Sequence, residues 1–237
     1  MTQPTGLDER RAPALEPRVT LPAFAFTWLA AAVASAVPLI VFADPDEATP
    51  IPVLAASLIA GWVVYLLGVA MTSRAYGTGD ARSDFSISFR PGDLIGVPIG
   101  VASQLALIPL VYLPLQAVWP DTFDEQALSE TAEDLIDRAD GASLVLLFAL
   151  VVVGAPLVEE IVYRGLLQRP LLGRFATPAV LVGVAALFAV IHFRPIEYPG
   201  LFVAGLVFGV CAWRSGRLGL AIVAHAAFNA TGLAFAL

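Results

Sequence analysis

Residues 143–166 read SLVLLFALVVVGAPLVEEIVYRGL, an apolar run that ends in two adjacent glutamates and, four residues after the second, an arginine. A charged side chain at the centre of a membrane helix costs about 2.5–3.5 kcal/mol on insertion scales. Charges kept at that depth normally face the interior of a helix bundle and mark a functional site. The stretch therefore predicts a membrane helix that carries a polar site at its end.

The composition of the whole chain agrees with this interpretation. The 237 residues are 58% hydrophobic and 14% charged, whereas soluble domains carry about 25% charged residues. Seven apolar stretches approach the ~20 residues that a spanning helix needs, at about 24–43, 51–71, 94–119, 142–158, 176–193, 198–213 and 218–237. The sequence predicts an all-α, polytopic transmembrane bundle of about seven helices, with a tilted, kinked or partly re-entrant third helix because that stretch is rich in proline.

The arginines predict how this bundle is oriented. All 13 basic residues are arginine. Successive loops lie on alternate sides of the membrane, and 11 arginines fall on the side of the N-terminal tail, whereas only Arg138 and Arg194 fall on the other. Positive charges concentrate on the cytoplasmic side of membrane proteins. We therefore expect a multi-pass protein of the cell membrane with a cytoplasmic N-terminus. The acidic loop at about 120–141 then lies outside, and we expect a solvated amphipathic helix there. Nothing in the sequence suggests a nucleic-acid surface.

Few strong polar groups fall within the predicted helices, and they gather in the C-terminal half. His192 and His225 are the only histidines, and both lie in apolar stretches. Glu160 and Arg164 are spaced i, i+4 and can form an ion pair on one helix. Glu159 is turned about 100° away from Glu160, which leaves one carboxylate paired and the other free to enter a cavity as a general base.

His225 and Asn229 share the same i, i+4 spacing. Each group also has a purely structural interpretation: a helix-end ion pair, a packed histidine, or an asparagine that joins two helices by a hydrogen bond. Their presence in one bundle favours a single site.

In order, Glu159-Glu160-x-x-x-Arg164, Phe188-x-x-x-His192 and His225-x-x-x-Asn229 resemble the three motifs of the CPBP intramembrane proteases. That family includes the type II CAAX prenyl endopeptidases and the Abi proteins. The resemblance covers about residues 142–237. It implies an intramembrane endopeptidase whose motif helices surround a cavity within the bilayer and whose substrates are membrane-associated proteins or peptides.

The resemblance also implies a role for each motif residue. Glu159 would activate the attacking water with help from His192, and His225 and Asn229 would stabilise the oxyanion. Glu160 and Arg164 would pair and shape the site, with Phe188 in support. No cofactor is required by this scheme. The alternative is a Zn²⁺ ion held among Glu159, Glu160, His192 and His225, which would lower the pKa of bound water to about 7.

These expectations divide the chain into three parts: a disordered cytoplasmic tail (1–20), variable transmembrane helices with the acidic outer loop (21–141), and a catalytic helical core (142–237).

Two other functions stay open. A proton-coupled transporter would also use buried Glu and His, and a proteolytically inactive scaffold would keep the motifs for folding. The sequence leaves the substrate and the oligomeric state undefined. Gly205 and Gly209 form a GxxxG pattern, which we expect to pack α-helices within the chain.

Overall fold

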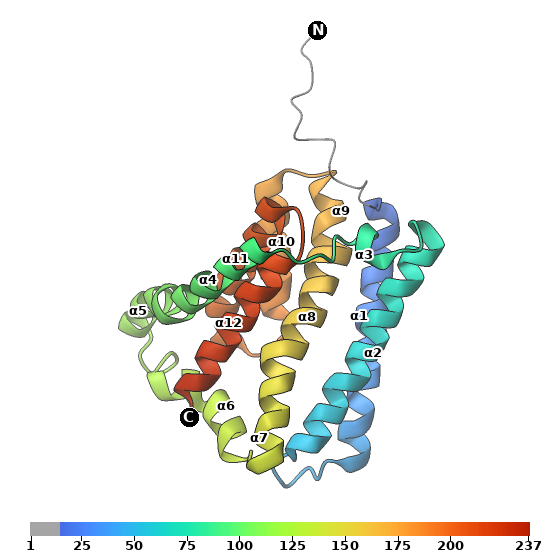
Figure 1. The fold of residues 1–237 in the computed structure, drawn as a ribbon. Coiled ribbons are helices and arrows are strands. Elements are labelled where there is room, and N and C mark those ends of the chain that lie inside the picture. Colours follow the sequence, from blue (N-terminus) through green and yellow to red (C-terminus); the bar gives the residue numbers. More distant parts are fainter. Residues whose placement is uncertain (1–14) are drawn as a thin grey trace.

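The computed structural model describes residues 15–237, and this part of the chain is helical without any strand. Figure 1 shows the helices as a bundle, with α1 and α2 side by side as a hairpin at one edge. The helices are α1 (Pro17–Phe42), α2 (Ile51–Tyr76), α3 (Ala81–Asp84), η1 (Pro91–Ile95), α4 (Gly96–Ala102), η2 (Ser103–Leu107), α5 (Ile108–Val118), α6 (Glu125–Asp137), α7 (Gly141–Phe148), η3 (Ala149–Gly154), α8 (Ala155–Glu159), η4 (Glu160–Gln168), α9 (Arg169–Leu172), α10 (Thr177–Val190), η5 (Pro195–Glu197), α11 (Tyr198–Ser215) and α12 (Gly219–Phe235).

The predicted apolar stretches all form helices. Within residues 15–237, five helices are long and apolar enough to cross a membrane, and α10 and α12 are shorter apolar helices. The five are Arg18–Phe42, Ile51–Tyr76, Pro91–Val118, Gly141–Leu172 and Pro195–Ser215. The predicted all-α polytopic class is confirmed. The acidic loop contains the helix α6.

The first helix begins earlier than the sequence suggested. Residues 1–14 of the predicted tail lie outside the described residues, and α1 begins at Pro17, inside the range 1–20. Proline suits the first turn of a helix because its φ is already helical and its missing N–H has no partner there in any case.

Three π-helical segments interrupt the long helices, and each ends two residues before a proline. The segments η2, η3 and η4 precede Pro109, Pro156 and Pro170. Proline has no N–H to donate and its ring crowds the preceding turn, so the regular i→i−4 bond is lost there. The wider turns continue each helix through the break. The motif residues Glu160 and Arg164 lie within η4, which agrees with the frequent occurrence of π turns at functional sites.

Glycines allow α4 to cross α12 closely, and Figure 1 shows α4 running across α12. A Cβ atom added at Gly100 would lie 2.1 Å from the Ala224 carbonyl oxygen, and one at Gly96 would lie 2.7 Å from the Ala224 nitrogen. Side chains cannot occupy these positions without moving one helix. The contact fixes α12 one residue before His225.

A buried carboxylate closes the turn between α2 and α3. Asp84 accepts hydrogen bonds from the Ser73 hydroxyl and from both the amide and the hydroxyl of Thr78. Burial would raise the pKa of the Asp84 carboxyl, but these hydrogen bonds together outweigh it and hold the pKa below its ordinary value of 3.8. The ionised carboxylate therefore stabilises this end of the α1–α2 hairpin.

Candidate active site

Glu160 lies at the centre of a fully buried polar cluster. Its side chain has 0% exposure, as does that of Arg164, whose Nη1 atom lies 3.2 Å from Glu160 Oε1. His225 Nδ1 donates to the same oxygen over 3.0 Å, because a carboxylate can only accept. Glu160 is therefore the paired carboxylate that the i, i+4 spacing predicts, and it holds the imidazole of α12 against η4.

Glu159 has a different environment from its neighbour. Its side chain is 24% exposed, and its Oε2 atom lies 3.9 Å from His225 Nε2, too far for a direct hydrogen bond. Glu159 lines a cavity of about 260 Å³ together with His192. The two adjacent glutamates are therefore separated into one buried ion-pair partner and one cavity-facing carboxylate.

Much of that cavity wall comes from the α1–α2 hairpin. Trp28, Ala31, Ala32 and Ser35 contribute from α1, and Leu58, Gly61, Trp62 and Tyr65 contribute from α2. No motif in the sequence pointed to these residues, because α1 and α2 look like ordinary apolar helices. Their small side chains leave space beside Glu159, and their aromatic side chains bound it.

His192 begins the connection after α10 and is held in one tautomer by the backbone. Its Nδ1 atom lies 2.6 Å from the Phe188 carbonyl oxygen, which only accepts, so Nδ1 carries the proton. In the neutral ring Nε2 is then an acceptor. His192 can therefore accept a hydrogen bond from a water in the cavity that it shares with Glu159.

Asn229 contacts the backbone of η3, in the long helix that carries the first motif. Its Nδ2 atom donates to the Val151 carbonyl over 2.8 Å. In η3 the Ala155 N–H bonds to Leu150 rather than to Val151, and the next residue, Pro156, has no N–H. Asn229 thus satisfies a carbonyl that the π turn and the proline leave without a helical donor.

Two phenylalanines enclose the charged pair. The Phe208 ring stacks on His225 with centroids 4.4 Å apart. The Phe188 ring lies edge-on to His192 and 4.7 Å from the Arg164 guanidinium carbon. Such cation–π contacts stabilise a desolvated arginine. Phe188 belongs to the second motif, whereas Phe208 was not predicted.

A ladder of hydrogen bonds joins η4 to α11. Arg164 Nη2 donates to the Gly205 carbonyl over 2.9 Å, and Gln168 Nε2 donates to the Gly209 carbonyl over 3.0 Å. Both side chains are four residues apart, as are both carbonyls, so the two helices match in register. The GxxxG pattern is therefore an internal packing face. Gln168 was missed, although its spacing from Glu160 and Arg164 places all three on one face.

The donors do not fit a shared zinc ion. Among the described residues, no group of three or more His, Cys, Asp or Glu side chains is placed to hold a metal. His225 Nδ1 is occupied by Glu160 and His192 Nδ1 by a backbone carbonyl. The predicted set of Glu159, Glu160, His192 and His225 is thus divided between an ion-pair cluster and a cavity wall.

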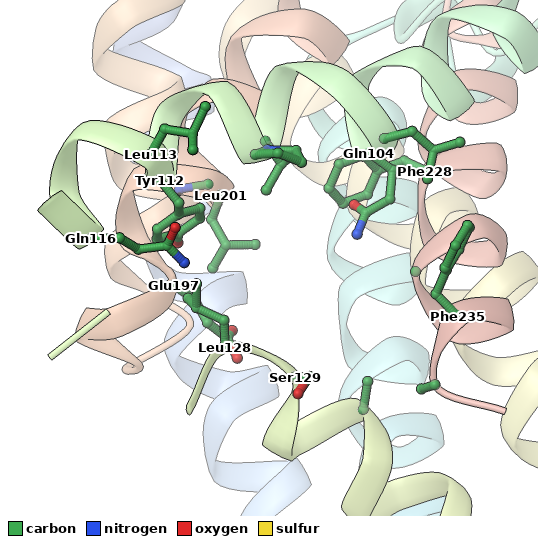
Figure 2. Close-up of a pocket in the computed structure, with 17 residues that line it drawn as sticks. Gln104, Tyr112, Leu113, Gln116, Leu128, Ser129, Glu197, Leu201, Phe228 and Phe235 are labelled. Atoms are coloured by element: carbon green, nitrogen blue, oxygen red, sulfur yellow. Dashed lines mark hydrogen bonds between the residues drawn. The ribbon is translucent and has the colours of Figure 1, made fainter. Parts of the chain in front are cut away.

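A second, larger cavity of about 650 Å³ lies on another side of the bundle, between α5, α6, α11 and α12 (Figure 2). It shares no lining residue with the Glu159 cavity. Phe228 lines it and contacts Phe208, whose ring stacks on His225. The two cavities are therefore separated by the aromatic layer around the buried cluster.

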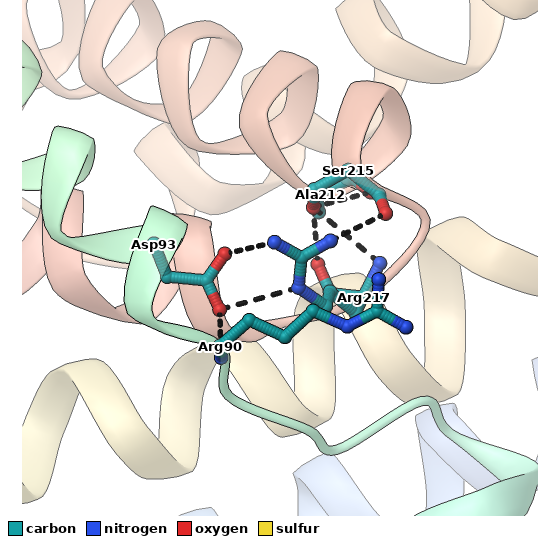
Figure 3. A network of polar contacts seen from close by, with 5 residues as sticks. All are labelled: Arg90, Asp93, Ala212, Ser215 and Arg217. Carbon is teal, nitrogen blue, oxygen red and sulfur yellow. Dashed lines mark hydrogen bonds and ion pairs between the residues drawn. The ribbon is translucent and has the colours of Figure 1, made fainter.

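An ion pair far from the motifs fixes the start of α12. Arg217 donates through Nε and Nη2 to the two carboxylate oxygens of Asp93, which is 2% exposed, as Figure 3 shows. Asp93 also accepts from the Arg90 amide over 2.7 Å. These bonds tie η1, before α4, to the loop that leads into α12, the helix that carries His225 and Asn229.

The fold and this cluster define an all-helical membrane protein with ionisable groups buried between its helices. Residues 141–231 match the family model described as type II CAAX prenyl endopeptidase Rce1-like. The match confirms the resemblance to the CPBP and CAAX proteases over this segment. The match begins at α7, so α1 and α2 lie outside it. Comparisons with curated proteins and with solved structures give no match.

Proposed function

We propose that this chain is an intramembrane endopeptidase that hydrolyses membrane-associated proteins or peptides with a water activated by Glu159. The observation that carries the proposal is the division of the glutamate pair. Glu159 lines a cavity with His192, while Glu160 is fully buried against Arg164 and His225. The family match supports the peptidase class.

The chemistry needs a base, a positioned water and charge stabilisation. Glu159 takes a proton from water, the resulting hydroxide attacks the peptide carbonyl carbon, and Glu159 then protonates the departing amine. His192, through Nε2, accepts the second hydrogen bond of the water and orients it. The products are a carboxylate and an amine, and a positioned base of this kind contributes about 10²–10⁴-fold in rate.

His225 has a role that depends on its protonation. Because Glu160 accepts the Nδ1 proton, donation from Nε2 to an oxyanion requires the imidazolium form. Asn229 donates one Nδ2 hydrogen to the Val151 carbonyl, and the second hydrogen of the same amide can donate to the oxyanion. We therefore propose His225 and Asn229 as the oxyanion donors, with the bond to Val151 holding Asn229 in place between η3 and α12.

The proposed location is the cell membrane, with a cytoplasmic N-terminus. The distribution of the 13 arginines supports this orientation. Reporter fusions after residues 45 and 78 test it: alkaline phosphatase should be active only after residue 45, and a cytoplasmic reporter only after residue 78. The reverse pattern would overturn the orientation.

The experiment that tests the function compares protein termini in membranes of cells that express the wild type or Glu159→Gln at equal levels. We expect uncut precursors to accumulate with Glu159→Gln and processed termini to return with the wild type. Glu47→Gln, in the exposed loop between α1 and α2, is the matched control and should process normally. Identical termini in all three strains would overturn the peptidase function and favour the transporter or scaffold.

A further inference from the structure

We propose that the cavity between α5, α6, α11 and α12 binds an extended apolar peptide segment with a basic end. The site is separate from the Glu159 cavity. A peptide ligand accords with the proposed peptidase function, on which the inference rests in part, but its binding does not require Glu159.

The size and walls of the cavity suit such a ligand. Its volume of about 650 Å³ falls within the roughly 300–1,000 Å³ of typical ligand sites. Apolar side chains line it from η2 and α5, from α11 and from α12: Leu105, Ile108, Leu113, Leu201, Phe228 and Phe235. Figure 2 shows Leu113 and Leu201 at one end and Phe228 and Phe235 at the other. Apolar side chains of a ligand would therefore find hydrocarbon on both sides.

Two amide side chains in the wall indicate that the ligand has a peptide backbone rather than a plain hydrocarbon chain. Gln104 and Gln116 lie toward opposite ends of the cavity in Figure 2. They are separated by about 18 Å along the helix at 1.5 Å per residue, which an extended peptide spans with about five or six residues. A glutamine amide both donates and accepts, as does each peptide group, and peptide groups in apolar surroundings need such partners.

Gln104 itself has unmet hydrogen-bonding capacity. Its Oε1 atom is buried and has no hydrogen-bond partner within the described part of the chain, and Figure 2 shows its amide nitrogen directed into the cavity. By contrast, the Tyr112 hydroxyl in the same wall is already bonded to the backbone of Ile196 and Gly200. A ligand would therefore reach Gln104 through the amide nitrogen that faces the cavity, because the Oε1 atom is buried within the wall.

The acidic residues around the cavity favour a peptide whose end is positively charged. Glu197 lines it and forms an ion pair with Arg194. The helix α6 closes one side through Leu128, Ser129 and Ala132 and carries Glu130, Glu133, Asp134 and Asp137 on its exposed face, outside the lining. This acidic rim favours a lysine side chain or a free amino terminus and disfavours a fatty-acid carboxylate or an anionic headgroup.

Binding is measured with the full-length Glu159→Gln variant in nanodiscs, with empty nanodiscs subtracted, so that no cleavage occurs. The probe is a fluorescent six-residue peptide with an N-terminal lysine, five leucine or valine residues and an amidated C-terminus. Two matched peptides replace the lysine with acetylated glutamate or carry N-methyl groups on alternate backbone amides. We expect the lysine peptide to bind and both matched peptides to bind about three- to ten-fold more weakly.

Variants locate the site. Ala236 lines the cavity, whereas the next residue, Leu237, does not and is 73% exposed. Ala236→Trp should abolish binding and Leu237→Trp should leave it unchanged. Gln104→Leu should weaken binding about two- to ten-fold. Glu197→Gln should weaken lysine-peptide binding. Arg194→Gln also breaks the Arg194–Glu197 ion pair but keeps the carboxylate, so it should leave lysine-peptide binding unchanged.

The proposal is overturned if Ala236→Trp leaves binding intact, or if the three peptides bind equally. It is also overturned if monoolein displaces the probe while Gln104→Leu has no effect, since the cavity would then hold a lipid chain. The failure of the peptidase function has a separate signature: peptide binding persists while no membrane-protein terminus depends on Glu159.

Discussion

His225 Nδ1 donates to Glu160 Oε1 over 3.0 Å, while the opposite nitrogen of the same ring lies 3.9 Å from Glu159 Oε2. One imidazole therefore stands between the buried carboxylate and the cavity carboxylate. Through it, α12 and η4 share a single polar centre, and changes on either helix should reach both glutamates.

Removing one partner of the buried ion pair should cost more than removing both. Arg164→Met leaves the fully buried Glu160 carboxylate without its cation, a change that costs about 3–5 kcal/mol. The double variant Glu160→Gln/Arg164→Met should recover part of this loss. Thermal unfolding of the purified variants in detergent measures it. Equal stability of the single and double variants would show that the pair contributes no coupling.

Asn229→Ala should lower stability by about 1–3 kcal/mol because the Val151 carbonyl loses its donor. Pro156→Ala offers a compensating test, since an N–H at residue 156 could supply that carbonyl. We expect Asn229→Ala/Pro156→Ala to be more stable than Asn229→Ala. If the second change gives no recovery, the interpretation of the Asn229 contact is wrong.

Asp84→Asn should make the protein about 1.5–3 kcal/mol less stable at neutral pH, because hydrogen bonds to a charged acceptor are lost. The folded-state pKa of Asp84 is lowered, so its stabilising effect is present above the ordinary value of 3.8 and is lost as pH falls through the folded pKa. The difference between wild type and variant should therefore shrink below pH ~4. Unfolding measured from pH 3 to 7 checks this, and a constant difference would contradict it.

Gly100→Ala should displace α12 and reduce both stability and proteolysis, because the added methyl group would collide with the Ala224 carbonyl. Gly183→Ala in α10 is the matched control, since a Cβ atom there meets nothing within 4 Å. That control should be neutral or stabilising by up to ~1 kcal/mol. Equal effects of the two substitutions would remove the argument for close packing.

Metal chelators should leave proteolysis unchanged, because the described donors do not form a shared metal site. The measurement compares processing of a substrate identified by its termini before and after dialysis against chelator. Loss of activity that Zn²⁺ restores would contradict the mechanism proposed for Glu159.

Local patterns in the sequence predict the helices and one pair of contacts. Apolar length predicts the spanning helices, and the i, i+4 spacing places Arg164 against Glu160, because both depend only on residues close in the chain. The family motifs identify the residues of the cluster before their partners are known.

Contacts between distant elements could not be predicted in this way. The bond from Asn229 to Val151 depends on a π turn, a proline and the approach of α12. The pairing of Asp93 with Arg217 joins residues 124 positions apart. The cavity wall supplied by α1 and α2 consists of side chains that are common in any membrane helix, so composition carries no signal for it.

The wall that α1 and α2 form beside Glu159 divides the site between two parts of the chain. The donors and the carboxylates come from the segment that matches the family model, and the surface facing them comes from outside it. Mutations in the hairpin can therefore reshape the cavity beside Glu159 while the groups proposed to react stay in place. Such an arrangement would let related proteins diversify in the molecules they process without reinventing the chemistry.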